Sequence, residues 1–336
     1  MSTDRRNRPP LPAPLGSVLA PVYQAVVSQR NRKFDSGKHI QRASVPVISV
    51  GNLSVGGTGK TPVVTTIVRI LIEHNHRPGI AMRGYKARPG EPSDEQAEYT
   101  EALPGVPVVA QPDRVEGARL LTSTHNCSCI VLDDGFQHRF LARDLDIVLI
   151  DATRSVFQDH CLPKGWLREP VSSLSRAGAI LITHAESASP QQLESLSREL
   201  SSLTNCPIAI TEHTWSGVHR AGSNDENLET LQTLRAVLAS GIGNPTAFEH
   251  MAQSRGVHIE SHEIHPDHHH WTAQDLDHLD TVRQGLPVLT TRKDWVKIRR
   301  LDHPIMPHIL VPQLSIAFRT GEDAFRQMLL ATAQGA

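Results

Sequence analysis

The sequence predicts an α/β fold, with a mostly parallel sheet covered by helices on both faces and a smaller second α/β domain after it. Short, continuously apolar runs alternate with helix-length segments, which is typical of parallel strands that are buried on both faces. A glycine-rich loop at 54–61 joins the first such strand to a helix. A polar stretch at 216–232 is followed by a second and shorter strand–helix series.

Composition narrows the class of protein. The chain has 336 residues, of which 39% are apolar and 21% charged, and its formal net charge is −1. This length has room for two domains, and the near-neutral charge argues against a nucleic-acid-binding face. The four cysteines form no C-x-x-C pair, so a reduced, cytoplasmic setting is the simplest interpretation. No apolar run reaches the roughly 18 residues of a spanning helix, and residues 1–14 are predicted to be a disordered tail.

Residues 15–27 carry an apolar stripe at the helical period. Its members recur three or four positions apart and are Leu15, Val18, Leu19, Val22, Tyr23, Val26 and Val27. Basic residues follow at Arg30, Arg32, Lys33 and Lys38. One interpretation is a helix packed on the domain. The other is a helix that lies in a membrane interface, with its basic flank near anionic lipid.

The first domain is expected over residues 15–215, a linker over 216–232 and the second domain over 233–336. Strands of the first domain are predicted at 45–51, 79–82, 106–110, 129–134, 145–151, 178–183 and 207–211, with helices at 61–75 and 190–203. Strands of the second domain are predicted at 235–243, 256–264, 286–291 and 308–312, with helices near 246–255 and 272–284.

The stretch "SVGGTGKTP" (54–62) nearly matches the phosphate-binding P-loop, G-x-x-x-x-G-K-[ST], with Ser54 in place of the first glycine. Its glycines let backbone N–H groups approach a phosphate, and the N-terminus of the following helix adds its positive end. Lys60 is suited to the β- and γ-phosphates, and the Thr61 hydroxyl to Mg²⁺. This predicts a P-loop NTPase-type domain. The predicted nucleotide-binding residues are Ser54, Val55, Gly56, Gly57, Thr58, Gly59, Lys60 and Thr61.

A second anchor for a metal ion follows another apolar strand. The run "CIVLDDGFQH" (129–138) ends its strand in Asp133 and Asp134. Strand-end carboxylates of this kind hold Mg²⁺ directly or through water in P-loop enzymes. The alternative is a pair of turn or helix-capping carboxylates before Gly135. Together with Thr61, the two aspartates are the predicted ligands of Mg²⁺.

Histidines gather between His258 and Trp271, in "HIESHEIHPDHHHW". Three interpretations stay open. The cluster could bind a transition metal, although its spacing matches no standard zinc pattern. It could be a solvated loop. One histidine, oriented by a carboxylate, could also act as a general base.

These clusters, in this order, resemble the tetraacyldisaccharide 4'-kinase family, the lipid A 4'-kinases. The resemblance covers roughly residues 15–312, and in this family a serine at the first P-loop position is usual. The D-D-G-F-Q-H and L-R-E-P runs are its most specific motifs. The matching runs include "VPVISVGNLSVGGTGKTPVV" (45–64), "MRGYKAR" (82–88), "LDDGFQHRFLARDLDIVLIDA" (132–152), "LPKGWLREPVSSLSRAGAILIT" (162–183), "SGIGNPTAFE" (240–249), "HPDHHHWT" (265–272) and "LTTRKDWVKI" (289–298).

The resemblance implies a kinase of lipid A biosynthesis. It would use ATP and Mg²⁺ to phosphorylate the 4'-hydroxyl of a tetraacyl glucosamine disaccharide 1-phosphate. Because this acceptor is a membrane lipid, the resemblance implies a peripheral enzyme on the cytoplasmic face of the inner membrane, in contact with its anionic surface. We expect a monomer that binds no nucleic acid.

Site roles follow by position from the resemblance. Asp94 matches the aspartate of the family's G-D-E-P run, and His268 matches its histidine partner. Together they would take the proton from the attacking hydroxyl, while Lys60 acts on the phosphates. Domain closure would bring His268 to the P-loop side and exclude water. Substrate contacts are expected from Glu95, Arg114, Gln137, His138, Arg168 and Glu169, with a surface ion pair as the alternative for Arg114.

The chain departs from the family pattern at four positions. Ser93 replaces the glycine before Asp94, and Gln96 stands where the family has a proline. The family's T-T-E-K-D-A-V-K run becomes "TTRKDWVK", with Arg292 for Glu and Trp295 for Ala. These departures leave open the backbone conformation at Asp94 and the role of the second run.

Two other functions compete with the kinase. A P-loop GTPase-type metal chaperone would use the same G-K-T loop and a His-rich metal site. Guanine recognition needs N-K-x-D, whereas "TTRKD" places Lys293 directly before Asp294, so the spacing is wrong. A non-catalytic ATP-binding regulator is the third possibility, because a P-loop alone does not establish phosphate transfer.

Overall fold

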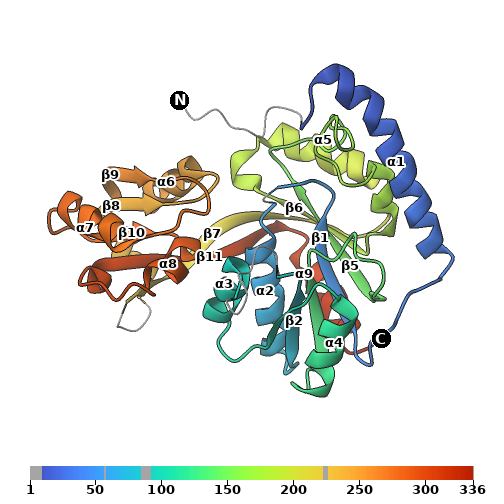
Figure 1. The fold of residues 1–336 in the computed structure, drawn as a ribbon, viewed down its shortest axis with the longest axis horizontal. Helices are drawn as coiled ribbons and strands as arrows, with labels where there is room; N and C mark the ends of the chain where they lie inside the picture. Colours follow the sequence, from blue (N-terminus) through green and yellow to red (C-terminus); the bar gives the residue numbers. More distant parts are fainter. Residues whose placement is uncertain (1–9, 57, 85–91, 222–225, 336) are drawn as a thin grey trace. The chain divides into compact units, whose positions relative to one another are not determined.

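The computed structural model describes residues 10–56, 58–84, 92–221 and 226–335 (Figure 1). The described chain forms two compact units. Unit 1 comprises the described residues up to Gly84, then Gly105–His213, and then those from Ala317 onward. Unit 2 comprises the described part of 85–104 together with Thr214–Ile316. Most of the predicted tail lies outside the described residues, and the first helix begins at Ala13.

The elements alternate along the chain as the apolar runs predict. The strands are β1 (Val47–Asn52), β2 (Pro78–Met82), β3 (Val108–Ala110), β4 (Cys129–Asp133), β5 (Leu145–Asp151), β6 (Ala179–Thr183), β7 (Ile208–Arg220), β8 (Arg235–Ser240), β9 (His258–Ile264), β10 (Val288–Thr290) and β11 (Ile309–Thr320). The α-helices are α1 (Ala13–Asp35), α2 (Lys60–Glu73), α3 (Asp94–Ala102), α4 (Arg114–Ser123), α5 (Pro190–Ser201), α6 (Pro245–Ser254), α7 (Ala273–Val282), α8 (Arg292–Ile298) and α9 (Glu322–Ala333).

Unit 1 is built on strands in the order β3-β2-β4-β1-β5-β6-β7. The central pairings are parallel, and Val50 of β1 lies opposite Asp133 of β4 on one side and Ile147 of β5 on the other. The carboxyl ends of neighbouring parallel strands therefore meet at one edge of the sheet. The loops that follow β1 and β4, which carry the P-loop and the D-D-G run, are brought together at this edge.

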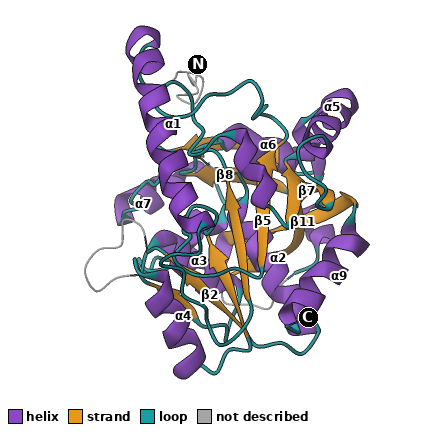
Figure 2. Cartoon of the chain, turned by 90° about the vertical axis from the view of Figure 1, so that its right-hand side faces the viewer, coloured by secondary structure: helices purple, strands orange, loops and turns teal. Residues whose placement is uncertain are grey.

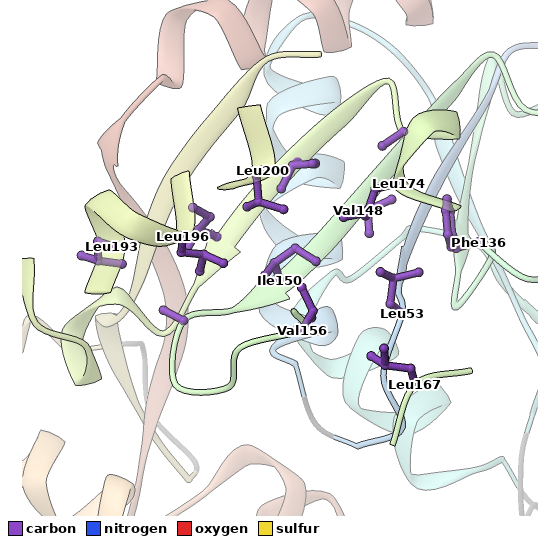
Figure 3. Close-up of a cluster of buried hydrophobic side chains, with 14 of the residues drawn as sticks. Leu53, Phe136, Val148, Ile150, Val156, Leu167, Leu174, Leu193, Leu196 and Leu200 are labelled. Carbon is purple, nitrogen blue, oxygen red and sulfur yellow. The ribbon is translucent and has the colours of Figure 1, made fainter. Parts of the chain in front are cut away.

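Helices cover the sheet of unit 1 because their apolar residues recur every three or four positions. Leu193, Leu196 and Leu200 of α5 pack with Val148, Ile150 and other residues of β5 and β6 in one buried cluster, and α2 lies behind these strands (Figure 3). Fully burying one leucine contributes about 1.5–3 kcal/mol, so this row stabilises the unit substantially. Helix α9 packs with α2 and β1 (Figure 2).

Unit 2 repeats the pattern on a smaller scale. Its strands follow the order β11-β10-β8-β9, and the pairings of β8 with β9 and β10 are parallel. Trp271 and Trp295 are buried in its core with residues of α7, α8 and β10. The predicted fold class, a mostly parallel α/β sheet with helices and a smaller second α/β part, is confirmed.

The chain divides differently from the predicted domain bounds. Residues of 85–104 belong to unit 2, and those from 317 onward belong to unit 1. The predicted linker is wrong over 216–220, because β7 continues to Arg220 and runs from one unit into the other. Its polar sequence reflects alternation, with Trp215 buried and Ser216 exposed. Residues 222–225 of that linker lie outside the described residues.

Candidate active site

The P-loop of unit 1 has the backbone that phosphate binding requires. Gly56 and Gly59 adopt φ values of 124° and 76°, which glycine reaches without the strain that other residues would meet. Helix α2 begins at Lys60 and directs its N-terminus at the loop. Pro62 is accommodated in the first turn, whose N–H groups have no partner within the helix. Gly57, a predicted phosphate ligand, lies outside the described residues.

Lys60 lies close to the carboxylate of Asp134, which directly follows β4. Its Nζ lies 3.7 Å from Oδ1 of Asp134 and 3.4 Å from Oδ1 of Asn52. Thr61 is the second residue of α2, and Thr58 is buried in the loop. Lys60 and Asp134 are 74 positions apart in the sequence. The fold nevertheless brings the P-loop and the D-D-G run to the same edge of the sheet.

The D-D-G run is fixed by close packing. Asp134 holds a left-handed backbone conformation, with φ of 53°. At Gly135 a Cβ would lie 2.6 Å from Oγ of Ser49 and 2.7 Å from a methyl group of Leu132, so only glycine fits. Burial acts to raise the pKa of Asp134, but the cations Lys60 and Arg168 outweigh it and hold that pKa below its usual range. Asp134 therefore stays ionised.

The L-R-E-P run lies along the P-loop and completes this network. The backbone N–H of Arg168 donates to the carbonyl of Leu53 at 2.7 Å, and its guanidinium donates to Oδ2 of Asp134 at 2.8 Å. The amide of Gln137 donates to the carbonyl of Asn52 at 2.9 Å. Arg168 and Gln137, both predicted substrate contacts, therefore lie beside the phosphate-binding loop, Arg168 through a backbone and a side-chain bond and Gln137 through its side chain.

Arg114 and His138 also lie at this site. Arg114 is only 6% exposed, so the alternative of a surface ion pair is wrong. Burial and the charge of Arg83 lower the pKa of Arg114, whereas the charges of Asp134 and Asp133 raise it. The guanidinium is therefore close enough to interact electrostatically with both carboxylates. Burial, followed by the charge of Arg114, lowers the pKa of His138 to about 4. His138 is therefore a neutral imidazole at pH 7.

Glu169 has the contacts of a scaffold residue. Its side chain is 2% exposed, pairs with Arg176 at 2.9 Å and accepts a hydrogen bond from Asn31 of α1 at 2.8 Å. Tyr23 of α1 donates to the carbonyl of Arg168 at 3.0 Å. These bonds fasten α1 to the same run that lines the P-loop.

Unit 2 contains the two residues predicted to act together as the catalytic base, His268 and Asp94. Nδ1 of His268 lies 3.3 Å from Oδ2 of Asp94, although the two residues are far apart in sequence. The ammonium of Lys297 lies 3.0 Å from the same carboxylate oxygen. Burial acts to raise the pKa of Asp94, but Lys297 and His268 outweigh it and hold the pKa below its usual range. Glu95, the neighbouring predicted contact, is exposed in the first turn of α3.

The departures around Asp94 have a local explanation. Ser93 is the N-cap of α3, with φ of −63° and ψ of 158°, so its backbone needs no glycine. Its hydroxyl accepts a hydrogen bond from the backbone N–H of Gln96 at 3.2 Å. A proline at position 96 has no N–H to donate. Serine at 93 and a residue other than proline at 96 therefore work together to begin the helix that carries Asp94.

His268 is positioned by a buried aspartate that sequence reasoning missed. Asp294 is fully buried and accepts hydrogen bonds from the backbone N–H of Gly241 at 2.9 Å and from Nε1 of Trp271 at 3.0 Å. The carbonyl of Gly241 in turn accepts from the backbone N–H of His268 at 3.1 Å. His268 itself has φ of 64°. Residues of the S-G-I-G, D-H-H-H-W and T-T-R-K-D runs thus meet at Asp294.

Two lysines of α8 were also missed. Lys297 contacts Asp94, while Lys293 donates to Asp267 at 2.7 Å and lies 3.5 Å from Nε2 of His268. Their spacing of four residues places both on one face of α8, which is the only sequence signal that could have found them. Trp295, a departure from the family pattern, is buried in the core, and Arg292 begins the helix.

Comparisons with known proteins identify the family of the chain. The model of the tetraacyldisaccharide-1-P 4'-kinase family matches residues 13–334. The tetraacyldisaccharide 4'-kinase of Anaeromyxobacter dehalogenans (strain 2CP-C) is 35% identical and aligns with 85% of this chain and 83% of its own length. That of Chlorobium limicola is 30% identical over 94% of this chain and 97% of its own.

A solved structure is similar over nearly the whole chain. The "apo" form of LpxK from Aquifex aeolicus, in complex with ATP, has a TM-score of 0.76 at 27% identity and covers 95% of this chain and 99% of its own. These findings do not favour the GTPase-type metal chaperone. Because the family model spans both the P-loop unit and the unit that holds Asp94 and His268, the chain belongs to the tetraacyldisaccharide-1-P 4'-kinase family.

Proposed function

We propose that the protein transfers the γ-phosphate of ATP to the 4'-hydroxyl of tetraacyldisaccharide 1-phosphate, a step of lipid A biosynthesis. The observation that carries this proposal is the meeting of Lys60 with Asp134 at the P-loop, in a chain of this kinase family. Phosphoryl transfer needs little covalent help from protein, so positioned cations and a base suffice. Cations of this kind lie in unit 1, and a candidate base lies in unit 2.

The residues at the end of β4 fit a magnesium ion. Mg²⁺ prefers oxygen ligands, and the Thr61 hydroxyl with the carboxylates of Asp133 and Asp134 would provide them. Asp134 is held ionised by its cationic neighbours. When bound, Mg²⁺ neutralises negative charge on the phosphates. Lys60 binds the β- and γ-phosphates, and Arg168 and Arg114 add positive charge around the transferred group.

The base is the pair of His268 and Asp94. The pKa of Asp94 is held below its usual range, so the carboxylate is ionised and can only accept a hydrogen bond. Nδ1 of His268 must therefore donate to it, which leaves Nε2 as the basic nitrogen of the neutral ring. A low pKa also makes the carboxylate a weak base by itself. We therefore assign proton removal from the 4'-hydroxyl to Nε2, with Asp94 orienting the ring.

We propose that α1 attaches the protein to the cytoplasmic face of the inner membrane. In the described part of the chain, no helix has the length and apolar content to cross a bilayer. Helix α1 instead exposes an apolar row, with side chains that are 40–69% accessible, and it is fastened to unit 1 by Tyr23 and Asn31. The exposed row consists of Leu15, Val18, Leu19, Val22 and Val26. An apolar row beside exposed basic residues suits an anionic lipid surface, where the acceptor resides.

Transfer of radiolabel from γ-labelled ATP to purified tetraacyldisaccharide 1-phosphate tests the reaction. Lys60→Ala should lower the transfer rate at least about 100-fold, because it removes a cation from the developing charge. His268→Ala should lower it by about 10²–10⁴-fold, the usual contribution of a general base. ATP binding should survive in His268→Ala and Asp94→Ala.

Glu194→Ala is the matched control for carboxylate loss, because among the described residues Glu194 pairs only with Arg198, in an exposed i,i+4 ion pair. Its transfer rate should equal that of the wild type. An active Lys60→Ala protein would remove the P-loop assignment. Full activity in both Asp94→Ala and His268→Ala would remove the proposed base while leaving the kinase assignment intact.

A further inference from the structure

Unit 1 contains, beside the P-loop, two histidines and a glutamate that the proposed phosphate transfer does not use. Among the described residues, His184, Glu186 and His213 each place one ligand atom within 4.8 Å of the other two. We propose that these side chains form a binding site for a transition-metal ion of the Zn²⁺ type, which holds His213 against the P-loop. This proposal stands independently of the kinase reaction.

The distances around Glu186 fit tetrahedral coordination. Its Oε1 lies 3.5 Å from Nδ1 of His184 and 3.2 Å from Nδ1 of His213. In zinc sites the ligand atoms lie 2.0–2.2 Å from the metal, so tetrahedral N and O ligands are about 3.3–3.5 Å apart. One carboxylate oxygen flanked by two imidazole nitrogens at these distances needs only small side-chain adjustments to take an ion.

Two neighbouring strands build the cluster. Strand β6 ends at Thr183, and the turn after it carries His184, in the left-handed region with φ of 58°, and Glu186. Strand β7 runs parallel to β6 and carries His213. Oε2 of Glu186 accepts a hydrogen bond from the backbone N–H of His213 at 3.0 Å, so the glutamate bridges the turn and the strand.

The chemistry of the ligands selects the ion. Imidazole nitrogens with a carboxylate suit Zn²⁺, Co²⁺ or Ni²⁺, whereas Mg²⁺ prefers oxygen ligands alone. The occupant therefore differs from the Mg²⁺ that accompanies ATP. Oδ2 of Asp151 lies 4.0 Å from Nε2 of His184. When Nδ1 binds a metal, the proton of this ring sits on Nε2, at ion-pair distance from Asp151 and too far for a hydrogen bond.

The cluster forms one wall of the P-loop. At Gly59 a Cβ would lie 2.7 Å from Nε2 of His213, and Oγ1 of Thr183 donates to the carbonyl of Thr58 at 3.1 Å. The side chain of His213 is only 6% exposed. Those of His184 and Glu186 are 28% and 30% exposed, so an ion can enter from their side. A bound ion would fix the His213 ring and, through it, the loop.

A second group of possible metal ligands in the described chain is a weaker candidate for a metal site. His265, His269 and Asp275 also lie within reach of one ion. Oδ2 of Asp275, however, already accepts from the backbone N–H and the hydroxyl of Thr272, both at 2.8 Å, as the cap of α7. Asp275→Asn is therefore a matched control for a change at Glu186.

Titration of the nucleotide-free, full-length protein with Co²⁺ in excess Mg²⁺ tests the site. Tetrahedral Co²⁺ gives visible absorption bands, and displacement by Zn²⁺ measures the affinity of the same site. We expect one saturable equivalent with tetrahedral bands in the wild type and in Asp275→Asn. Glu186→Gln and His184→Ala should each lower its affinity at least about 10-fold. Circular dichroism of the metal-free variants checks that they fold.

Two results would overturn the proposal. The first is equal Co²⁺ affinity in the wild type and in folded Glu186→Gln and His184→Ala proteins. The second is loss of the tetrahedral bands in Asp275→Asn with their retention in Glu186→Gln, which would assign the metal to the other group. Because the readout is optical and uses no lipid or ATP, neither result bears on phosphate transfer.

Discussion

At the scale of single residues, the charge next to Asp94 decides how the base works. Lys297 is the main group that lowers the pKa of Asp94, against the opposing effect of burial. Lys297→Met should therefore raise this pKa, so the ionised carboxylate that orients His268 forms only at higher pH. We expect kcat to fall at acidic pH, where the carboxylate of the variant is protonated, and to match the wild type at neutral pH, where it is ionised in both proteins. KM should be unchanged, because Lys297 acts through Asp94.

The pH dependence separates this role from a structural one. The acid limb of the kcat profile should move to higher pH in Lys297→Met. Arg300→Met is the matched control, since Arg300 is exposed just beyond the same helix and its loss should leave the profile unchanged. An acid limb that stays in place while kcat falls would contradict the assignment of Lys297 as a positioning residue.

His138 makes a second residue-scale prediction, about stability. Burial lowers its pKa from 6.5 to about 4 in the folded protein. Between these values the unfolded chain binds a proton that the folded chain does not, so stability falls as pH falls through this window. His138→Gln removes this loss. Between about pH 7 and pH 5 the wild type should lose about 1 kcal/mol relative to the variant, after allowance for solvent screening.

Urea unfolding at several pH values measures this difference. His125→Gln is the control, because it replaces an exposed histidine instead of a buried one. If the stability difference between His138→Gln and the wild type were constant from pH 7 to pH 5, the buried neutral imidazole would not be the cause.

Which residues lie close together can be predicted from sequence where each motif is continuous, whereas their roles stay predictions. The P-loop and D-D-G-F-Q-H runs point to Lys60 and Asp134, and parallel β1 and β4 bring them together. Lys297 and Asp294 were missed because their partners come from other elements. A buried aspartate that accepts from Gly241 and Trp271 leaves no periodic signal in its own run. Such contacts depend on tertiary packing, which spacing along one chain segment does not encode.

At the scale of elements, the apolar stripe of α1 divides into a partly buried edge and an exposed row. Tyr23 and Val27, at the edge of the predicted stripe, are partly buried, whereas Val18 and Val22 are among the most exposed apolar side chains of the described chain. If this row enters a membrane interface, Val18→Ser with Val22→Ser should weaken binding about 100-fold, since burying each valine contributes about 1.5 kcal/mol. Sedimentation with vesicles of phosphatidylglycerol and phosphatidylethanolamine measures it.

The matched control for α1 removes two exposed apolar side chains elsewhere in unit 1. Ile72 and Leu203 are 44% and 41% exposed, so Ile72→Ser with Leu203→Ser should leave vesicle binding unchanged. Equal losses in both double variants would indicate a non-specific apolar effect and would sink the assignment of α1 as the membrane contact.

Element prediction worked for buried strands and failed for short polar helices. Continuous apolar runs located β4, β5 and β6 within one or two residues of their ends. Helix α3 escaped because its sequence, "DEQAEYTEA", buries only Ala97 and Tyr99 and so shows no apolar stripe. The serine cap that begins it becomes informative only once the helix is known.

At the scale of the whole molecule, segments of the two units alternate along the chain. The chain passes from one unit to the other after residues 84, 104, 213 and 316. Sequence-based bounds assumed contiguous domains, because composition changes once, near the polar stretch at 216–232, and gives no sign of the other crossings. Neither unit is a continuous segment, so we expect the two to unfold in one cooperative transition.

Binding of ATP at unit 1 should therefore stabilise the whole chain. A ligand at 100 times its dissociation constant adds about 2.7 kcal/mol to the stability of the protein that binds it. For a chain of this size that should raise the calorimetric Tm by roughly 4 °C. Lys60→Ala should abolish most of the rise, and Asp94→Ala should keep it, because Asp94 lies in unit 2. A rise in Tm that is retained in Lys60→Ala and lost in Asp94→Ala would place ATP away from the P-loop. Two separate unfolding transitions, of which ATP shifts only one, would refute the cooperative coupling inferred from the alternating segments.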